Sequence, residues 1–217
     1  NCFNGARFLP EAINSVFAQT YDNWEMVFWD NQSTDTSAEV VRSYQDPRIR
    51  YYYASTHTFL YEARKHAINK ANGTLICFLD VDDWWAAAKV ATQVKLFDDP
   101  AVGLSCSNYW LVDERKGGKR HLRRRTSVPA GNMVDLLLKD YFVGMLTLMI
   151  RRSAYDQLEH GCDPRYHIIG DFDLVVRLAT RWKLSYLDEP LAFSRLHSGN
   201  ETWRHRERAV QEMESWA

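Results

Sequence analysis

The sequence lacks the patterns that identify a membrane span, a disulfide scaffold or a zinc ribbon. No run approaches the roughly 18 apolar residues that cross a bilayer. The cysteines are widely scattered, without the paired spacing of a metal site, and this usage is typical of a reducing cytoplasm. The four positions are Cys2, Cys77, Cys106 and Cys162.

An excess of charge of one sign is also lacking. The chain has 27 Lys and Arg residues against 28 Asp and Glu residues, and its formal net charge is -1. A protein so balanced has no overall attraction to the phosphates of nucleic acid or to an anionic membrane. We therefore expect no nucleic-acid partner, and any attraction to an anion must come from a local patch.

The chain does contain enough apolar material for one sizeable core. It has 217 residues, of which 46% are hydrophobic, so we predict a single domain over residues 1–217. Short apolar runs alternate with segments of helical periodicity, which predicts an α/β fold with a mostly parallel sheet flanked by helices. The expected helices run through 8–17, 40–44, 60–70 and 85–97, and the expected strands are 24–29, 49–53 and 75–79.

The most informative segment is a cluster of acids that follows a predicted strand. The apolar run 75–79 indicates a strand buried on both faces, and Asp80, Asp82 and Asp83 come directly after it. Side chains two apart in an extended segment point the same way, so Asp80 and Asp82 can converge on one hard cation, Mg²⁺ or Mn²⁺. The alternative is that these acids only cap the next helix.

Another acid ends a second predicted strand. Asp30 comes directly after the apolar run 24–29. Ligands of parallel α/β sheets bind outside the carboxyl ends of the strands, so Asp30 and the acids that begin at Asp80 are expected to meet at one site.

Several motifs in a fixed order carry more information than any one of them alone. They are Phe8–Tyr21, Trp29–Asp35, Ala63–Arg64, Phe78–Asp83, Gly170–Leu178, and Leu187–Leu191 with Arg195 and His197. This order resembles the family 2 glycosyltransferases of the GT-A fold, a Rossmann-like architecture. The resemblance spans essentially the whole chain. It implies that residues 1–100 form a nucleotide-sugar-binding half and residues 101–217 an acceptor-side half.

Roles for four donor-side residues follow from the resemblance. Asp30 would accept a hydrogen bond from the base of the nucleotide, with Arg64 nearby contacting the nucleotide. Asp80 and Asp82 would bind the ribose and the metal ion on the diphosphate. These roles suit a carboxylate that accepts from an N–H group and a guanidinium that offers a planar fork of donors. From the sequence alone, Arg64 could instead pair with Glu62 or another neighbouring acid.

Asp171 is the general base that the resemblance implies. It would take the proton of the acceptor hydroxyl as that hydroxyl attacks the anomeric carbon with inversion. Many family members have glutamate where this chain has Gly170, so the usual acidic pair is reduced to Asp171 with Asp173 two residues on. Asp171 opens a predicted helix, whose N-terminus should favour the charged carboxylate. The alternative is that Asp171 caps this helix and does nothing else.

A divalent cation, Mn²⁺ or Mg²⁺, is also implied, because negative charge grows on the departing diphosphate and a cation stabilises it. Asp82 would be one ligand. His197 stands where family members often place a histidine near the metal or the diphosphate, which makes it the second candidate ligand. Taken alone, a single histidine is more often structural.

Lys116 to Arg125 is the one clear block of like charge. Six of its ten positions are Lys or Arg, and the pair Gly117-Gly118 predicts a loop or hairpin that projects from the core. Such a patch suits an anionic acceptor or a peripheral contact with the inner face of a membrane. A solvated surface is the alternative.

The implied function is transfer of a sugar from a nucleotide-diphosphate donor, expected to be a UDP-sugar, to a saccharide or lipid-linked acceptor in cell-surface polysaccharide synthesis. A nucleotidyltransferase can share the architecture, but it normally carries a glycine- and basic-rich phosphate loop near its start, and none is visible here. The third possibility is a non-catalytic relative that binds nucleotide or saccharide. The intact Asp80, Asp82 and Asp171 argue against it.

Family members normally have an apolar strand immediately before the Asn-Gly pair that appears here as Asn4-Gly5. The sequence starts at Asn1, which leaves no room for that strand. Because the strand is central, we expect unpaired ladder hydrogen bonds on its two neighbours, with a groove in the sheet or a foreign strand in its place. We also expect that the sequence is a segment of a longer protein and binds its donor weakly or not at all in this form.

Overall fold

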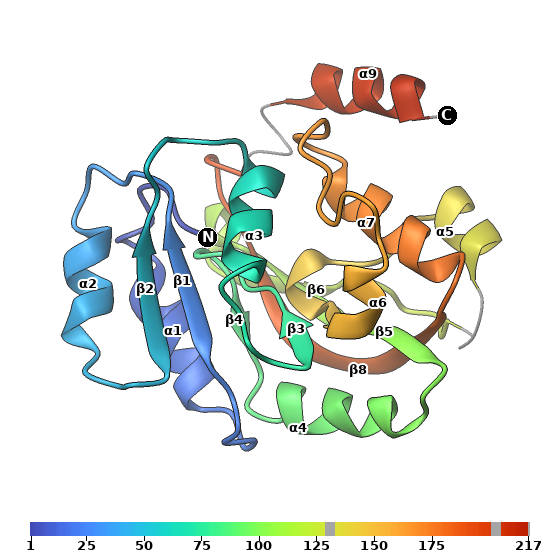
Figure 1. Ribbon diagram of the computed structural model, residues 1–217, viewed down its shortest axis with the longest axis horizontal. Helices are drawn as coiled ribbons and strands as arrows, with labels where there is room; N and C mark the ends of the chain where they lie inside the picture. Colours follow the sequence, from blue (N-terminus) through green and yellow to red (C-terminus); the bar gives the residue numbers. More distant parts are fainter. Residues whose placement is uncertain (129–132, 201–204, 217) are drawn as a thin grey trace.

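The sheet at the centre of the fold is divided into two parts (Figure 1). In the computed structural model, which describes residues 1–128, 133–200 and 205–216, a two-stranded sheet has the order β1-β2 and a larger sheet the order β3-β7-β5-β8-β4, with β6 beside β5. The strands are β1 (Met26–Asp30), β2 (Ile49–Tyr53), β3 (Leu75–Cys77), β4 (Trp84–Trp85), β5 (Val102–Asp113), β6 (Lys119–Leu122), β7 (Met149–Arg151) and β8 (Lys183–Leu196).

The larger sheet is mixed, which corrects the expectation of a mostly parallel one. β5 and β8 run parallel, but β7 is antiparallel to both β3 and β5, β4 is antiparallel to β8, and β6 is antiparallel to β5. Parallel neighbours need a long crossover, which the β1–α2–β2 unit has. β5 and β6 are instead joined by the short turn at Gly117 and Gly118, which forces the antiparallel direction.

Helices cover both faces of the sheet (Figure 1). None of the helices in the described part of the chain combines the length and the apolar character needed to span a bilayer. The α-helices are α1 (Leu9–Phe17), α2 (Ser37–Ser43), α3 (Leu60–Ile68), α4 (Lys89–Val94), α5 (Val134–Lys139), α6 (Arg152–Asp156), α7 (Gly170–Ala179) and α9 (Arg206–Trp216). The 3₁₀ turns are η1 (Lys95–Asp98), η2 (Glu114–Lys116) and η3 (Met145–Thr147).

The helix predicted over 85–97 starts later than expected. Trp84 and Trp85 form the short strand β4, and α4 begins only at Lys89. The Trp84 ring stacks on Phe193 of β8 at 5.2 Å between ring centroids, and the Trp85 indole N–H donates to the Leu146 carbonyl at 2.8 Å. These tertiary contacts outweigh the local helical pattern.

A groove separates β1 from β3. It is a cavity of about 550 Å³, bordered by both strands and by residues of α1 and α3. The run 75–79 is therefore not buried on both faces. Ile76 and Phe78 are buried, whereas Leu75, Cys77 and Leu79 are half-buried and line the groove.

The last helix, α9, lies beside the start of α7 (Figure 1). The Glu212 carboxylate accepts hydrogen bonds from three successive backbone N–H groups just before α7, at 2.9, 2.9 and 3.2 Å. They belong to His167, Ile168 and Ile169. The Trp216 indole N–H donates to Asp173 of α7 at 3.1 Å. These bonds hold α9 against the segment that leads into Asp171.

Candidate active site

The acids after β3 do not share one direction. The chain turns at this point, with the Asp83 N–H donating to the Asp80 carbonyl at 3.2 Å, so the parity of an extended segment does not apply. The Asp80 carboxylate instead accepts two hydrogen bonds from Nη2 of Arg64, at 2.6 and 2.9 Å. The Asp82 carboxylate turns toward His197. The predicted convergence of Asp80 and Asp82 is therefore wrong in its geometry, and the roles assigned to the two residues stay predictions.

Arg64 is the central cation of the site. It is 4% exposed on α3, and its guanidinium lies 5.0 Å from the centre of the Tyr61 ring. Burial opposes its charge, but the negative charge of Asp80, the nearby Tyr61 and the hydrogen bonds to Asp80 together outweigh burial and raise the pKa of Arg64. Burial likewise opposes the charge of Asp80, but the charge of Arg64 and its hydrogen bonds, with the amino terminus, together lower the pKa of that carboxyl group. The predicted alternative partner, Glu62, lies within 3.9 Å of His66 instead.

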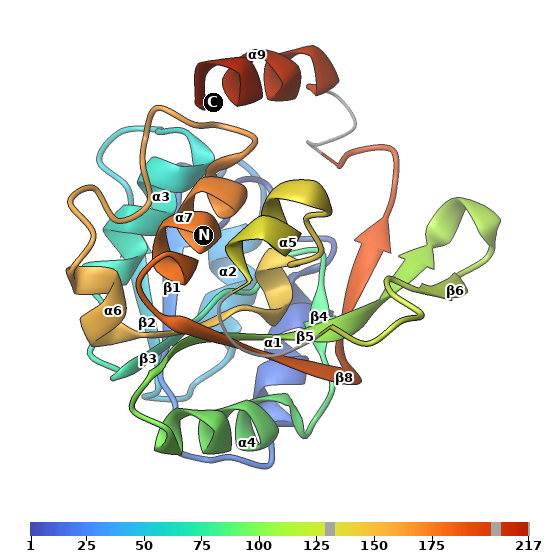
Figure 2. The same cartoon turned by 90° about the vertical axis from the view of Figure 1, so that its right-hand side faces the viewer.

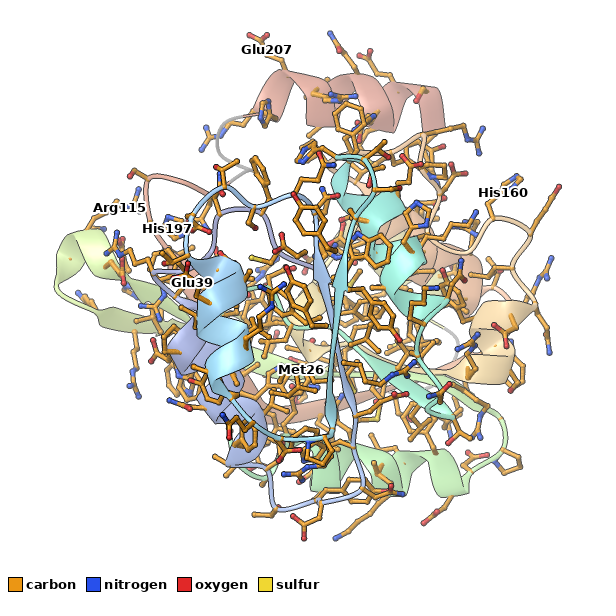
Figure 3. The ribbon with its side chains drawn as sticks, turned by 60° about the vertical axis from the view of Figure 1, so that its left-hand side comes forward. Met26, Glu39, Arg115, His160, His197 and Glu207 are labelled. Carbon is orange, nitrogen blue, oxygen red and sulfur yellow. The ribbon has the colours of Figure 1, made fainter. Side chains whose placement is uncertain are left out.

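Asp82 and His197 form a second pair, with 3.0 Å between Oδ2 and Nε2. The backbone N–H of Gly199 donates to Nδ1 of His197 at 3.1 Å. Nδ1 is therefore the acceptor of the neutral ring, so its proton sits on Nε2 and points at Asp82. Figure 3 shows His197 on the side of the molecule from which the hairpin with Arg115 projects.

Negative charge accumulates around this pair. Burial and the charge of Asp80 raise the pKa of Asp82, against the hydrogen bond from His197. Burial and the charges of Asp82 and Asp80 also raise the pKa of Asp83, which accepts the backbone N–H of Arg195 at 2.9 Å. No group of three His, Cys, Asp or Glu side chains in the described residues is arranged to hold a metal. Mg²⁺ typically uses one or two carboxylates plus substrate phosphates, and Asp82 offers one such carboxylate. Metal binding by Asp82 and His197 stays a prediction.

Asp30 lies at the carboxyl end of β1 and is fully buried. Its Oδ1 accepts the Ser33 N–H at 2.7 Å, and its Oδ2 accepts the Tyr51 hydroxyl at 2.6 Å. Burial, with the bond to Asp30, raises the pKa of Tyr51. Within the described residues no hydrogen bond or ion pair joins Asp30 to Arg64 or the acids after β3. Its contact with a nucleotide base stays a prediction.

Asp171 stands in the first turn of α7, where its Oδ1 accepts the backbone N–H of Phe172 at 2.8 Å. We expected the helix terminus to favour the charged carboxylate. Burial instead raises the pKa of Asp171, although the Phe172 N–H and the charge of Arg64 act against it. Asp171 therefore interacts electrostatically with the same guanidinium that binds Asp80. A general base is most effective when its pKa lies near the working pH, so a raised pKa suits Asp171 to act as a base near neutral pH.

Tyr61 is a residue of this site that sequence reasoning missed. It is 3% exposed on α3, and burial followed by the charge of Asp171 raises its pKa well above the ordinary value. A Cβ atom on Gly170 would lie 2.5 Å from two atoms of the Tyr61 ring, so the ring occupies the space of a side chain at position 170. This packing accounts for glycine next to Asp171. No local signal predicts it, because the two residues are far apart in the sequence.

Arg195 belongs to a predicted motif but was assigned no role. It is 8% exposed, and its guanidinium donates to the Asp82 carbonyl at 2.9 Å and to Glu114 at 2.6 Å. It also pairs with Glu11 of α1. Arg195 thereby ties the turn that carries Asp82 to both α1 and η2, and its partners could not be inferred from spacing.

The basic segment 116–125 forms the expected hairpin, which projects from the body of the molecule (Figure 2). Gly117 and Gly118 have φ of 65° and 77°, the left-handed conformation that glycine adopts most readily. Arg124 pairs with Asp140, and Arg123 donates to the Tyr141 carbonyl at 3.0 Å. The exposed basic residues are Lys116, Lys119, Arg120, His121 and Arg125.

Comparison with known proteins gives independent evidence of the family to which the chain is related. A family model described as glycosyl transferase family 2 matches residues 1–158. The chain is 28% identical over 159 residues to the putative teichuronic acid biosynthesis glycosyltransferase TuaG of Bacillus subtilis, covering 72% of this chain and 62% of that protein. It is 28% identical over 151 residues to the UDP-Glc:alpha-D-GlcNAc-diphosphoundecaprenol beta-1,3-glucosyltransferase WfgD of Escherichia coli, covering 70% and 58%. The chain thus spans less than two thirds of the length of either relative.

Solved structures resemble the fold over nearly all of the chain. S. aureus TarS superposes with a TM-score of 0.73 at 15% identity, covering 97% of this chain and 38% of TarS. The mannosyltransferase PcManGT from Pyrobaculum calidifontis, in complex with GDP-Man and Mn²⁺, has a TM-score of 0.73 at 16% identity and covers 98% and 62%. These likenesses confirm the predicted GT-A fold.

Proposed function

Because the chain belongs to glycosyl transferase family 2, we propose that it transfers a sugar from a nucleotide-diphosphate donor to a hydroxyl group, inverting the anomeric carbon. The observation that carries this proposal is the position of Arg64. It hydrogen-bonds Asp80, from the half predicted to bind the donor (1–100), and acts electrostatically on Asp171, from the half predicted to bind the acceptor (101–217). The acid proposed to bind the donor and the residue proposed as the base thus both interact with one cation, by hydrogen bonds for Asp80 and electrostatically for Asp171.

Asp171 is the base in this proposal. It accepts the proton of the acceptor hydroxyl while the hydroxyl oxygen bonds to the anomeric carbon and the nucleoside diphosphate leaves with the bonding electrons. Burial raises the pKa of Asp171, which strengthens its affinity for the proton, while the charge of Arg64 acts in the opposite direction. Asp30 and Arg64 would position the nucleotide, and Asp80 the ribose.

Asp82 and His197 are the residues that would hold Mn²⁺ or Mg²⁺. A metal ion at Nε2 of His197 would replace the proton that now points at Asp82. Its chemistry would be to stabilise the negative charge that develops on the diphosphate. Support comes from the crowding of Asp80, Asp82 and Asp83, which a divalent cation would relieve.

We propose a UDP-sugar as donor and a saccharide or lipid-linked acceptor, in cell-surface polysaccharide synthesis. TarS has been solved with UDP and with UDP-GlcNAc, and WfgD is a UDP-Glc:alpha-D-GlcNAc-diphosphoundecaprenol glucosyltransferase. PcManGT carries GDP-Man, so GDP-mannose is the competing donor to exclude.

The hairpin suits an acceptor of that kind. Lys119 and Arg125 are exposed cations on a projecting element, where they can attract a diphosphate or an anionic membrane surface. We propose that the chain works in the cytoplasm and contacts the inner face of the membrane through residues 116–125. Reversing both charges, Lys119→Glu with Arg125→Glu, should abolish sedimentation with vesicles that contain phosphatidylserine. The matched control reverses two exposed lysines elsewhere, Lys95→Glu with Lys139→Glu, and should sediment as before.

Calorimetric titration with UDP, with and without Mn²⁺, tests the proposed function. The chain should bind UDP in a metal-dependent way, and Asp82→Asn should lose this dependence. Asp171→Asn should keep UDP affinity and lose transfer from a UDP-sugar by at least about 10²-fold, the lower end of what a general base contributes. If the Asp171→Asn variant transferred sugar at the wild-type rate, a residue other than Asp171 would have to be the general base. Release of pyrophosphate from a nucleoside triphosphate would instead identify a nucleotidyltransferase.

A further inference from the structure

Arg195 of β8 holds three successive residues of the turn that follows β3. Its Nε donates to the Asp82 carbonyl at 2.9 Å, and its backbone N–H donates to Oδ1 of Asp83, also at 2.9 Å. Its guanidinium lies 4.6 Å from the centre of the Trp84 ring. The turn that carries Asp82 is therefore attached to one point on β8 through a carbonyl, a carboxylate and an aromatic ring.

The same residue also leads into His197. Because β8 ends at Leu196, His197 is the first residue after the strand and lies two positions from Arg195. The segment is closed by Asn200, whose Nδ2 donates to the Arg195 carbonyl at 3.1 Å and whose Oδ1 accepts the His197 N–H at 2.6 Å. Arg195 thus anchors both members of the pair in which Nε2 of His197 lies 3.0 Å from Oδ2 of Asp82.

The guanidinium of Arg195 is itself fixed from several directions. It forms ion pairs with Glu11 of α1 and with Glu114 of η2, the second at 2.6 Å. The centre of the Phe8 ring lies 4.9 Å from it. Arginine suits this place because its planar fork binds several oxygen atoms while its face packs on aromatic rings, and a lysine ammonium offers no such fork. The two glutamates also balance its charge, which would otherwise oppose a metal ion nearby.

We propose that Arg195 is a positioning residue that sets the separation of Asp82 and His197. The proposal rests on the proposed function, in which these two residues hold a divalent cation. Arg195 touches neither the substrate nor the metal ion and acts through the turn and through the end of β8. It is therefore an outer partner of the two candidate ligands, and loss of such partners typically weakens metal affinity by about 10–100-fold.

Calorimetric titration with UDP, with and without Mn²⁺, tests the proposal on Arg195→Lys. This variant keeps the positive charge and loses the planar fork. UDP binding in the presence of Mn²⁺ should weaken by at least about tenfold, whereas UDP binding without metal should not change. A second, milder variant is Glu114→Gln, which keeps Arg195 but weakens one of its ion pairs. It should shift the Mn²⁺-dependent affinity in the same direction by a smaller factor.

The matched control is Arg151→Lys. Arg151 also donates to backbone carbonyls, those of Val102 at 3.0 Å and Phe97 at 2.8 Å, and its guanidinium lies 5.4 Å from the centre of the Phe97 ring. It belongs to β7, however, and pairs with Leu75, at the end of β3 opposite to the acids. The control should bind UDP as the wild type does, with and without Mn²⁺.

Amide exchange at Asp83 tests the geometry without any ligand. The Asp83 N–H donates to the Asp80 carbonyl within the turn, at 3.2 Å. Because local opening of the turn breaks this bond, the amide should exchange at least about tenfold faster in Arg195→Lys than in the wild type. Exchange in Glu114→Gln should be faster by a smaller factor, and exchange in Arg151→Lys should equal that of the wild type.

Wild-type values of both quantities in Arg195→Lys and Glu114→Gln would overturn the proposal. Equal weakening of UDP binding with and without Mn²⁺ would also overturn it, because Arg195 would then support the donor site as a whole. A wild type without any Mn²⁺-dependent UDP binding would instead contradict the proposed function. Exchange at Asp83 would still decide whether Arg195 fixes the turn, so the two failures can be told apart.

Discussion

Adding one methyl group at Gly170 tests the packing that holds Asp171 in place. An ideal Cβ there would lie 2.5 Å from Cγ and Cδ2 of Tyr61, whereas real Cβ contacts essentially never fall below 3.0 Å. Tyr61 is only 3% exposed, so its ring cannot swing into solvent without leaving the core. Gly170→Ala must therefore displace the ring or the start of α7.

The expected cost combines two opposing effects. Overpacking of this kind costs about 1–3 kcal/mol, whereas replacing glycine by alanine inside a helix gains up to about 1 kcal/mol. Their sum is small enough to be ambiguous in a single variant. In a double-mutant cycle with Tyr61→Ala the helix effect cancels, and the steric conflict alone remains as a coupling energy of about 1–3 kcal/mol.

Urea unfolding of the wild type, the two single variants and the double variant measures this coupling. Tyr61→Ala alone should cost about 3–5 kcal/mol, as expected for removal of a buried ring, and Gly170→Ala should be tolerated better in that background than in the wild type. The slope of the unfolding free energy against urea concentration should stay constant across the four proteins. A coupling energy below about 0.5 kcal/mol would show that the Tyr61 ring shifts at little cost, and would refute the steric conflict between this ring and a side chain at position 170.

Three further predictions follow from pairs described above. Arg64→Met should lower the free energy of unfolding, measured in urea, by about 2–4 kcal/mol, which is less than for a fully buried pair because Asp80 is 35% exposed. Arg64→Lys should lower the free energy of unfolding by less. Equal losses in the two variants would contradict a role for the charge. The pKa of Glu212 is lowered, because the hydrogen bonds to its carboxylate together outweigh burial. Its contribution to stability is therefore complete above the unfolded pKa of about 4.3 and is lost as pH falls through the lower folded pKa. Amide exchange of Ile168 should accelerate over that acidic range in the wild type, whereas Glu212→Gln should show no such pH-dependent acceleration. His197→Gln should weaken Mn²⁺-dependent UDP binding at least tenfold by titration while metal-free binding is unchanged; a loss in both would make His197 structural.

Elements with a strong local pattern were predictable. β2 spans Ile49–Tyr53, the predicted range, and α1 begins within one residue of the expected start. Periodicity alone determines such segments, because one apolar face must be buried whatever the rest of the chain does. β4 was missed because Trp84 is fixed by Phe193, a partner that lies more than a hundred positions away.

The pairings of the candidate site residues could not be predicted from the sequence, and the functional roles of these residues stay predictions. The motifs identified Asp80, Arg64 and Asp171, but the ion pair of the first two, and the influence of Arg64 on the third, depend on how α3 and α7 pack. The direction of the Asp171 pKa was wrong because a helix terminus contributes modestly, whereas desolvation of a carboxylate grows steeply with burial. Burial is a property of the whole fold.

The division of the sheet also determines how the molecule should come apart. Within the described residues, β1 and β3 share no ladder, so the β1–α2–β2 unit is joined to the larger sheet partly by polar side chains at the seam. Glu25, directly before β1, accepts the Gly73 N–H at 3.1 Å and a side-chain N–H of Asn72 at 3.4 Å. Such bonds are individually weak, and cooperative units that share few of them open at a lower free energy than the whole. We therefore expect the amino-terminal unit, which carries Asp30, to open at a lower free energy than the sheet around β5 and β8.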